Sequence, residues 1–408
     1  MTQASQSGDG QKQAERVVAP LLILTTVFFI QFLSRIVLGP LLPALERDLG
    51  LTHAEAGSLF LPISVGYFVT LLLSGFISAR LGHRRTIIMS GSLVGCAMLL
   101  AASVPGIWGL SVGLLLLGLA AGPYLPSGLA TLTGLVRPEH WGKALAVHEL
   151  APNVSFVVAP LVAVGLLEIV SWRGALAVLG AASLIWAVVF ARKGQGGHFP
   201  GQAPDLGSLG ALARQPSFWI MMFLFCMGVG GSLGVYGMLP LYLVNDHGMD
   251  LDRANLLVSV SRLACMGAAF LSGWISDRMG PQRTLAVVFL STGLFTLGLG
   301  LASGPWLLVC LFLQPATAVC FFPPAFSAIA HLGPASARSV TVSLTVPPAF
   351  MVGGGMLPAA IGWLGERSSF GLGIALFGAS LILATCLVLR LHLAPPAPVA
   401  SVEIKAET

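Results

Sequence analysis

The amino-acid sequence predicts an all-α membrane protein whose twelve transmembrane helices form two pseudo-symmetric six-helix bundles. Three observations lead to this fold class. The 408 residues are 56% hydrophobic and only 9% charged, whereas a soluble protein would carry about a quarter charged residues. Apolar runs long enough to cross a bilayer recur along the whole chain. A short motif also occurs twice, at Gly75 and at Gly273, an offset of 198 residues.

The individual spans follow from the apolar runs between charged residues and Pro/Gly breaks. A helix needs about 20 mainly apolar residues to cross the hydrocarbon core. The first half of the chain then contains candidate spans at 18–40, 56–79, 86–104, 107–134, 144–167 and 174–191. The second half contains candidates at 217–243, 254–276, 284–302, 305–330, 340–363 and 370–391. The even number of spans places both ends of the chain on the same side of the membrane.

Further landmarks keep the offset of the motif, which indicates two equivalent halves. Pro126 corresponds to Pro324, and Pro160 corresponds to Pro358. We therefore expect an N-terminal bundle at 1–193 and a C-terminal bundle at 216–394. The Gly- and Pro-rich stretch 194–215 between them is typical of a cytoplasmic linker. The tail 395–408 is expected to be disordered.

The distribution of Lys and Arg predicts the orientation, because cytoplasmic loops are enriched in both residues. With a cytoplasmic N-terminus, four of them fall outside, namely Arg47, Arg173, Arg253 and Arg367. Fifteen fall inside, namely Lys12, Arg16, Arg80, Arg84, Arg85, Arg137, Lys143, Arg192, Lys193, Arg214, Arg278, Arg283, Arg338, Arg390 and Lys405. We therefore predict a multi-pass protein of the plasma membrane, the inner membrane in a bacterium, with both termini cytoplasmic.

The composition argues against other classes of function. The basic residues lie in loops on one side of the membrane, so the positive charge does not indicate a nucleic-acid partner. The six cysteines lie in apolar runs without a CxxC or Cys/His cluster, which indicates packing residues and no metal site. The sequence also contains no P-loop, so it does not indicate a function driven by ATP. We expect a monomer in the lipid bilayer, with no cofactor and no enzymatic activity.

The duplicated motif is the most specific feature of the chain. The first copy reads Gly75-Phe-Ile-Ser-Ala79-Arg80-Leu-Gly82-His-Arg84-Arg85. The second reads Gly273-Trp-Ile-Ser-Asp277-Arg278-Met-Gly280-Pro-Gln-Arg283. A G-x-x-x-D-R-x-G-x-x-R motif between the second and third helices of each half resembles the major facilitator superfamily of secondary transporters. The resemblance covers the whole chain.

This resemblance implies that the motif works as a conformational latch on the cytoplasmic face, where its Asp meets basic residues and a helix N-terminus. Ala79 stands where the family has Asp, so the first latch is weakened or uses other partners. A simpler interpretation is that the arginines anchor the loops by the positive-inside rule. The predicted latch residues are Gly75, Arg80, Gly82, Arg84, Arg85, Gly273, Asp277, Arg278, Gly280 and Arg283.

Three charged residues fall inside predicted spans, where a charge costs at least about 2.5–3.5 kcal/mol. They are Arg35 in the first span, Glu149 in the fifth and Arg262 in the eighth. The resemblance implies that helices 1, 4, 7 and 10 surround a cavity lined at its sides by 2, 5, 8 and 11, so all three charges can reach it. Two arginines against one carboxylate favour an anionic solute, and a guanidinium fork suits carboxylate, sulfonate or phosphate groups. Arg35 could instead snorkel to the outer interface.

Glu149 is the predicted proton carrier, because burial and a nearby guanidinium act in opposite directions on its protonation. His148 is the alternative titrating group. Adjacent helical residues point about 100° apart, so we expect one of the two to face the cavity. Glu149 could instead be a structural partner of an arginine or of Lys143, and His148 a packing residue. Tyr124 and Tyr236 are further candidate contacts of the substrate.

Two local features indicate bending and close approach of helices. Gly122-Pro123-Tyr124-Leu-Pro126 and Phe321-Phe322-Pro323-Pro324 are matched breaks in the fourth and tenth spans, and a proline inside a span permits bending. The triplet 353–355 in the eleventh span consists of glycines, which allow a neighbouring helix to approach closely.

The leading hypothesis is a secondary active transporter of a small, carboxylate-like organic anion, coupled to protons, as in symport, and working by alternating access. The first alternative is a proton-driven exporter of drugs or metabolites. Ala159-Pro160 lacks the glycines that surround this position in family exporters, so the match is poor there. The second alternative is a non-transporting membrane sensor or assembly factor, which the Ala79 departure brings into consideration.

Overall fold

The computed structural model describes residues 3–202, 214–330, 332 and 338–391. It describes the side chains of these residues except in 3–16 and 338–340 and at Met266 and Ala330. Residues 203–213 of the predicted linker and the predicted tail 395–408 lie outside these ranges. The described residues form helices and connecting segments, without a strand, and eleven helices among them are long and apolar enough to cross a membrane.

In the first half, three spans are built from two helices in series and three from one long helix. They are α1 (Gln3–Ile36) with α2 (Leu38–Leu49), α3 (His53–Ser58) with α4 (Phe60–Leu81), α5 (His83–Ser103), α6 (Gly106–Ala121) with α7 (Tyr124–Leu135), α8 (Trp141–Leu167) after the 3₁₀ turn η1 (Pro138–His140), and α9 (Trp172–Lys193). The break between α6 and α7 falls at the predicted Gly122-Pro123.

In the second half, two spans contain a π-helical turn. The spans are α11 (Pro216–Val229), η3 (Gly230–Gly234) and α12 (Val235–Asn245), then α13 (Leu251–Ser261) and α14 (Cys265–Met279), then α15 (Pro281–Leu301), then α16 (Pro305–Val319) and α17 (Phe322–Ala330), then α18 (Arg338–Met351), η5 (Val352–Met356) and α19 (Leu357–Arg367), and α20 (Phe370–Val388). The turn η5 contains the predicted glycine triplet.

The eighth predicted span, 254–276, is not one continuous helix. α13 ends at Ser261 and α14 begins at Cys265. Between them the backbone N–H groups of Arg262 and Leu263 donate to carbonyl groups three residues earlier, as in a tight turn. This interruption explains why α13 and α14 are each too short to count among the eleven spans, and together they supply the twelfth crossing. The predicted fold class is thereby confirmed.

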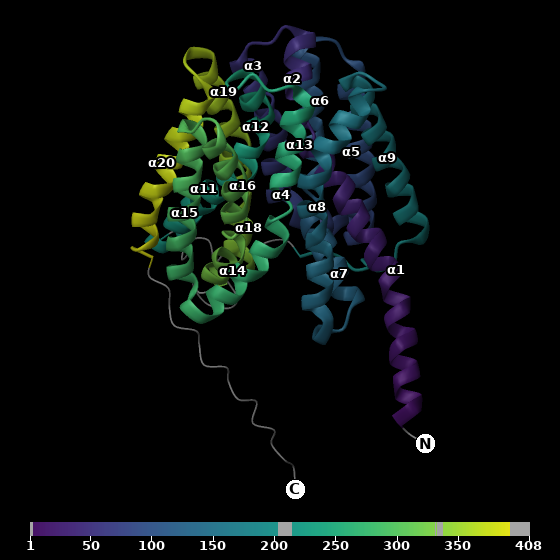
Figure 1. Cartoon of the computed structure of the whole chain (residues 1–408). Coiled ribbons are helices and arrows are strands. Elements are labelled where there is room, and N and C mark those ends of the chain that lie inside the picture. Colours follow the sequence, from purple (N-terminus) through teal and green to yellow (C-terminus); the bar gives the residue numbers. More distant parts are fainter. Residues whose placement is uncertain (1–2, 203–213, 331, 333–337, 392–408) are drawn as a thin grey trace.

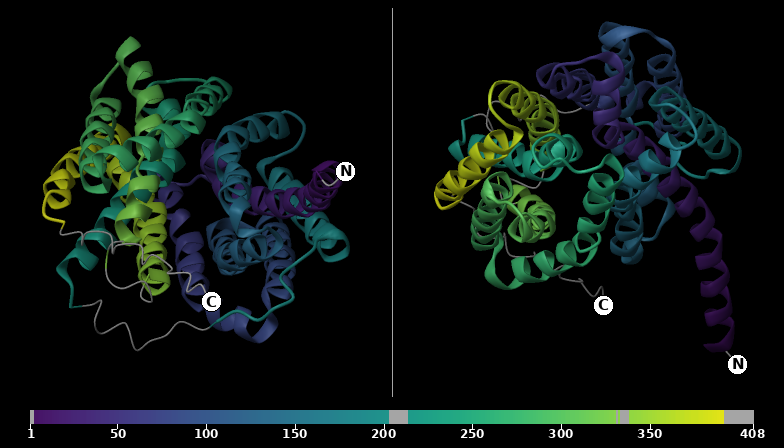
Figure 2. Two further views of the ribbon diagram at one scale, coloured as in Figure 1. Left: turned by 90° about the horizontal axis from the view of Figure 1, so that it is seen from below. Right: turned by 45° about the horizontal axis from the view of Figure 1, so that its top comes forward.

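The two halves lie side by side, the first in purple to blue and the second in green to yellow (Figures 1 and 2). In each half the third span packs on the sixth, α5 on α9 and α15 on α20. The start of α1 and the end of α20 lie at the same end of the bundle (Figure 1). We call this the inner end, because it carries the basic loops. The outer end carries the connections 50–52, 246–250 and 368–369.

At the outer end the two halves are in direct contact, with α3 packed on α19 and α2 packed on α12. Small residues permit this approach, since a Cβ atom added at Gly57 would lie 2.7 Å from the carbonyl oxygen of Pro358. The backbone N–H of His53 also donates a 2.8 Å hydrogen bond to the carboxylate of Glu366. The outer end is therefore closed in this conformation.

Candidate functional site

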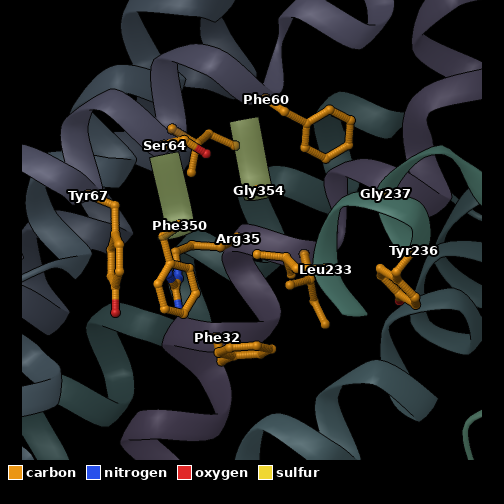
Figure 3. Close-up of a pocket in the computed structure, with 12 residues that line it drawn as sticks. Phe32, Arg35, Phe60, Ser64, Tyr67, Leu233, Tyr236, Gly237, Phe350 and Gly354 are labelled. Atoms are coloured by element: carbon orange, nitrogen blue, oxygen red, sulfur yellow. The ribbon is translucent and has the colours of Figure 1, made fainter. Parts of the chain in front are cut away.

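A cavity of about 40 Å³ lies between the two halves (Figure 3). A water molecule needs roughly 10–15 Å³ by this measure, so the cavity has room for a few waters. It is lined by α1 and α4 from the first half and by η3, α12, α18 and η5 from the second, with the residues Phe32, Arg35, Ile36, Phe60, Ile63, Ser64, Tyr67, Leu233, Tyr236, Gly237, Phe350 and Gly354. These are spans 1, 2, 7 and 11. The fourth and tenth spans, which the resemblance assigned to the cavity, do not line it.

Arg35 brings a positive charge to this cavity without an anionic partner. Its Cζ lies 4.2 Å from the ring centroid of Tyr67, 5.0 Å from that of Phe32 and 5.9 Å from that of Phe350 (Figure 3). Among the described residues, it forms no hydrogen bond or ion pair, and its buried Nε has no acceptor. Aromatic faces stabilise a cation, but they do not satisfy its N–H donors. The guanidinium edge is therefore available to an anion.

Arg262 contacts the same aromatic cluster from the second half. Its Cζ lies 4.6 Å from the ring centroid of Phe156 and 4.7 Å from that of Tyr236. The side chain is only 2% exposed, and its Nη2 donates a 2.9 Å hydrogen bond to the carbonyl oxygen of Ser232 in η3. Two aromatic rings thus cover Arg262, and in this conformation Arg262 does not line the cavity. Arg262 itself lies in the turn between α13 and α14.

Sequence reasoning missed the rings that join the two arginines. Phe32 contacts Arg35, and its ring centroid lies 5.3 Å from that of Phe156, which in turn contacts Arg262. Phe32 precedes Arg35 by three residues, and residues three apart share a helix surface, so this contact was predictable. The contacts with Tyr67 and Phe350 cross between spans, and no spacing in the sequence indicates them.

His148 and Glu149 are neighbours on α8 that differ in burial, although Nδ1 of His148 lies 3.7 Å from the Glu149 carboxylate. His148 is fully buried; its ring stacks on Phe28 with 4.5 Å between centroids. The Glu149 side chain is 53% exposed. Glu149 and Phe156 are seven residues apart, close to two helical turns, so they share one face, and Phe156 uses that face to contact Tyr236 of the second half. Glu149 is thus exposed on this face, whereas Phe156 on the same face contacts the second half.

The two predicted tyrosines occupy different places. Tyr124 is buried inside the first half, where its hydroxyl donates to the carbonyl oxygen of Leu24 (2.8 Å) and lies 3.3 Å from Nε2 of His148. It does not line the cavity. Tyr236 does line it, and its hydroxyl donates a 3.4 Å hydrogen bond across the halves to the carbonyl oxygen of Phe156.

The first motif copy binds the end of the sixth span of its own half. Gly82, after α4, has a φ of 78°, a value that favours glycine. The Arg84 guanidinium donates to the carbonyl oxygens of Ala191 (2.9 Å) and Gly194 (2.7 Å) at the C-terminal end of α9. Cations stabilise this end of a helix because its carbonyl groups point outward.

The second copy repeats this arrangement with a neutral side chain. Gly280, after α14, has a φ of 83°, and Gln282, at the position of Arg84, donates to the carbonyl oxygens of Val388 and Leu391 (both 3.0 Å) at the end of α20. Asp277, Arg80, Arg85 and Arg283 are exposed, and Arg278 lies over the ring of Trp274. In this conformation, the described side-chain hydrogen bonds of Arg84 and Gln282 join each copy to the sixth span of its own half. The backbone of the first copy also bonds to the linker, where His83 and Arg84 donate to the carbonyl oxygens of Phe199 and Gly197.

The comparisons with known proteins all indicate the same family. The sequence pattern of the Major Facilitator Superfamily matches residues 24–358. A probable sulfoacetate transporter of Cupriavidus necator is 25% identical over 277 residues, covering 63% of this chain and 64% of the relative. The chain thus matches just under two thirds of that relative's length. A probable nitrate/nitrite transporter of Mycobacterium tuberculosis is 28% identical over 298 residues, covering 70% of this chain and 73% of the relative.

Further similarity comes from a gallate transporter and from a solved structure. The gallate transporter, of Pseudomonas putida, is 24% identical over 308 residues, covering 65% of this chain and 67% of the relative. A bacterial homologue of the human lysosomal transporter Spinster has the same fold, with a TM-score of 0.81 at 14% identity over 92% of this chain and 98% of that one. These matches agree with the prediction of a transporter rather than an enzyme. The chain belongs to the major facilitator superfamily.

Proposed function

We propose that the chain is a secondary active transporter that carries a small organic anion by alternating access, with Arg35 as the group that binds the anion. The observation that carries this proposal is the state of Arg35. It is a cation inside a membrane-spanning helix, with no acceptor among the described residues, on the wall of a cavity between the two halves. A charge in a span is costly and needs a partner, and an anionic substrate supplies one.

The surrounding charge supports an anion rather than a cation. Arg35 and Arg262 contact one aromatic cluster, and neither has an ion-pair partner among the described residues. Their field favours negatively charged solutes. The relatives named above are transporters of sulfoacetate, of nitrate or nitrite, and of gallate, which are all anions. These names support the charge of the substrate and leave its structure open.

The conformation corresponds to one state of an alternating-access cycle. The outer end is closed by α2 and α3 against α12 and α19, and Glu149 is exposed toward the inner end. With the predicted orientation in the plasma membrane and both termini cytoplasmic, this is an inward-facing state. The bundles 1–193 and 216–394 are the bodies that move, joined by the linker 194–215, and the chain acts as a monomer.

Glu149 is the proposed proton carrier. It lies on the face of α8 that is directed toward the second half, two turns from Phe156 and hence from the contact with Arg262. Its side chain is 53% exposed in this conformation, and closing the inner end would cover it. His148 is the second candidate, because its buried Nδ1 lies 3.7 Å from Glu149 and has no hydrogen-bond partner among the described residues.

The test is transport by the purified full chain in proteoliposomes. A panel of carboxylates, sulfonates and phosphates is offered with and without an imposed pH gradient, and protein-free vesicles give the passive leak. We expect uptake of at least one organic anion, stimulated by the gradient. The proposal is wrong if no anion of the panel moves above the leak. An exporter of lipophilic compounds would instead move uncharged or cationic compounds in the same vesicles.

A further inference from the structure

We propose that the substrate is a monoanion with an apolar ring as its body, such as an aromatic monocarboxylate or monosulfonate, rather than a polyhydroxylated acid or a dianion. The inference rests on the proposed function and deepens it, because it assigns the chemical class of the anion. Two observations lead to it: the number of cations that can reach the cavity, and the chemistry of the cavity wall.

One guanidinium is available to the substrate, not two. Arg35 lines the cavity with unsatisfied donors. The buried Nε of Arg262 also has no acceptor among the described residues, but Arg262 does not line the cavity. It is 2% exposed, donates to the carbonyl oxygen of Ser232, and is covered by the rings of Phe156 and Tyr236. Arg35 can bind one carboxylate or sulfonate through two parallel hydrogen bonds. A second anionic group would meet the apolar wall without a partner, and burying an unpaired charge is strongly unfavourable.

The wall offers apolar surface and few hydrogen-bonding groups. Rings of Phe32, Phe60 and Tyr236 lie around the cavity together with aliphatic side chains such as Leu233 (Figure 3). Side-chain hydroxyls come from Ser64 and from the two tyrosines in the lining, and the Tyr236 hydroxyl already donates to the carbonyl oxygen of Phe156. A sugar acid would lose its water contacts without replacement. An aromatic ring loses few such contacts and can pack edge-to-face against these rings.

The size of the cavity links binding to the transport motion. About 40 Å³ admits a few waters, so a ring that carries a carboxylate or sulfonate has little room to spare there. Arg35 and Phe60 lie on helices of the first half, and Leu233 and Phe350 lie on helices of the second. Widening the cavity therefore separates the halves. The body of the anion would then press on the interface that alternating access has to open.

The experiment compares labelled anions one at a time in proteoliposomes of the full chain. Benzoate and benzenesulfonate are the aromatic monoanions, D-galactonate is the polyhydroxylated monoanion, and sulfoacetate is the dianion. Benzenesulfonate stays ionised, which keeps its passive leak low, and protein-free vesicles correct the remainder. We expect the initial rate for an aromatic monoanion to exceed that for D-galactonate and for sulfoacetate at least tenfold.

A matched pair of variants tests whether the wall causes this preference. Phe60→Leu keeps the wall apolar but removes one ring, and Phe76→Leu makes the same change at an exposed position of the same helix. We expect the ratio of benzoate to D-galactonate uptake to fall severalfold in Phe60→Leu and to stay unchanged in Phe76→Leu. The ratio is measured on one preparation, so a lower yield of folded protein does not affect it.

The outcomes separate this inference from the proposed function. Faster uptake of D-galactonate or sulfoacetate than of the aromatic anions overturns the assignment of class and leaves anion transport intact. An equal loss of the uptake ratio in both Phe variants overturns the role of the wall. If none of the four anions, and no anion of the wider panel, moves above the leak, the proposed function itself fails.

Discussion

Replacing Arg35 by Gln should abolish most anion transport without destabilising the protein. The change removes the positive charge and the guanidinium fork but keeps a polar side chain of similar length. Arg35 makes no hydrogen bond or ion pair with the described residues, and its contacts are with the rings of Phe32, Tyr67 and Phe350. Its removal therefore leaves no polar group of the described protein without a partner.

The expected loss of binding follows from the hydrogen bonds that the anion would lose. A hydrogen bond to a charged group contributes about 1.5–3 kcal/mol, whereas a neutral one contributes about 0.5–1.5 kcal/mol. Exchanging two charged bonds for one neutral bond costs about 2.5–4.5 kcal/mol, or roughly 60- to 1,600-fold in affinity. Arg35→Lys keeps the charge but loses the fork and the stacking on Tyr67, so we expect an intermediate loss of about tenfold.

Stability should change little, because two effects of the substitution oppose each other. Each cation–π contact contributes about 0.5–2 kcal/mol, and all are lost. A buried charge without an ionic partner, however, costs several kcal/mol of desolvation, which the variant relieves. We therefore expect a melting temperature in detergent within about 2 °C of wild type, or above it. Arg47→Gln, at an exposed position of α2, is the matched control and should alter neither quantity.

The assay is concentration-dependent uptake of the best anion of the panel into proteoliposomes, with folding checked by thermal unfolding and gel filtration. Uptake by Arg35→Gln with an unchanged apparent KM and rate would refute the assignment of Arg35 as the anion-binding group. A large loss of thermal stability together with the loss of uptake would show that Arg35 has a structural role that the described contacts do not reveal.

Three further substitutions test other parts of the mechanism. Glu149→Gln should remove the stimulation of uptake by a pH gradient while leaving anion exchange in counterflow; equal stimulation in this variant would exclude Glu149 as the proton carrier. Arg262→Gln should lower the melting temperature as well as uptake, because the carbonyl oxygen of Ser232 loses a charged hydrogen bond of about 1.5–3 kcal/mol; an unchanged melting temperature contradicts this. Arg84→Ala should destabilise the protein by a similar amount, because its hydrogen bonds to the end of α9 are lost. Arg85→Ala, at an exposed neighbouring position, is the control and should not destabilise it. Equal unfolding temperatures for the two variants would argue against a stabilising contact between Arg84 and α9.

The fold could be predicted from the sequence because its determinants are local. Span length, positive loops and the offset between Gly75 and Gly273 each depend on short stretches of chain. The break of the eighth span at Arg262 could not be predicted in this way, because helix propensity gives no reason to interrupt a helix at an arginine. The guanidinium at this break bonds to Ser232 of a different span and lies against two aromatic rings. Contacts of this kind between spans leave no local signal in the sequence.

The charged residues of the candidate site could be predicted from the sequence, but the residues that form the wall of the cavity could not. The cost of a charge in a span indicated Arg35 and Arg262 without any alignment. Their different exposure depends on which aromatic side chains of neighbouring spans cover them, and a single sequence does not contain that information. Tyr124 illustrates the limit: its hydroxyl donates within the first half, although its span was expected to line the cavity.

In each half, one side chain of the repeated motif, Arg84 or Gln282, links two helices. Both side chains connect the start of the third span of a half to the carbonyl end of its sixth span, where α5 and α15 already pack on α9 and α20. Such contacts favour motion of each half as one body in the proposed transport cycle. The halves themselves meet through the closed outer end and the aromatic cluster around the cavity. An anion that separated the rings of this cluster would therefore act on an interface between two stiff halves. A small displacement at Arg35 could then change the angle between the halves and so reach both ends of the bundle.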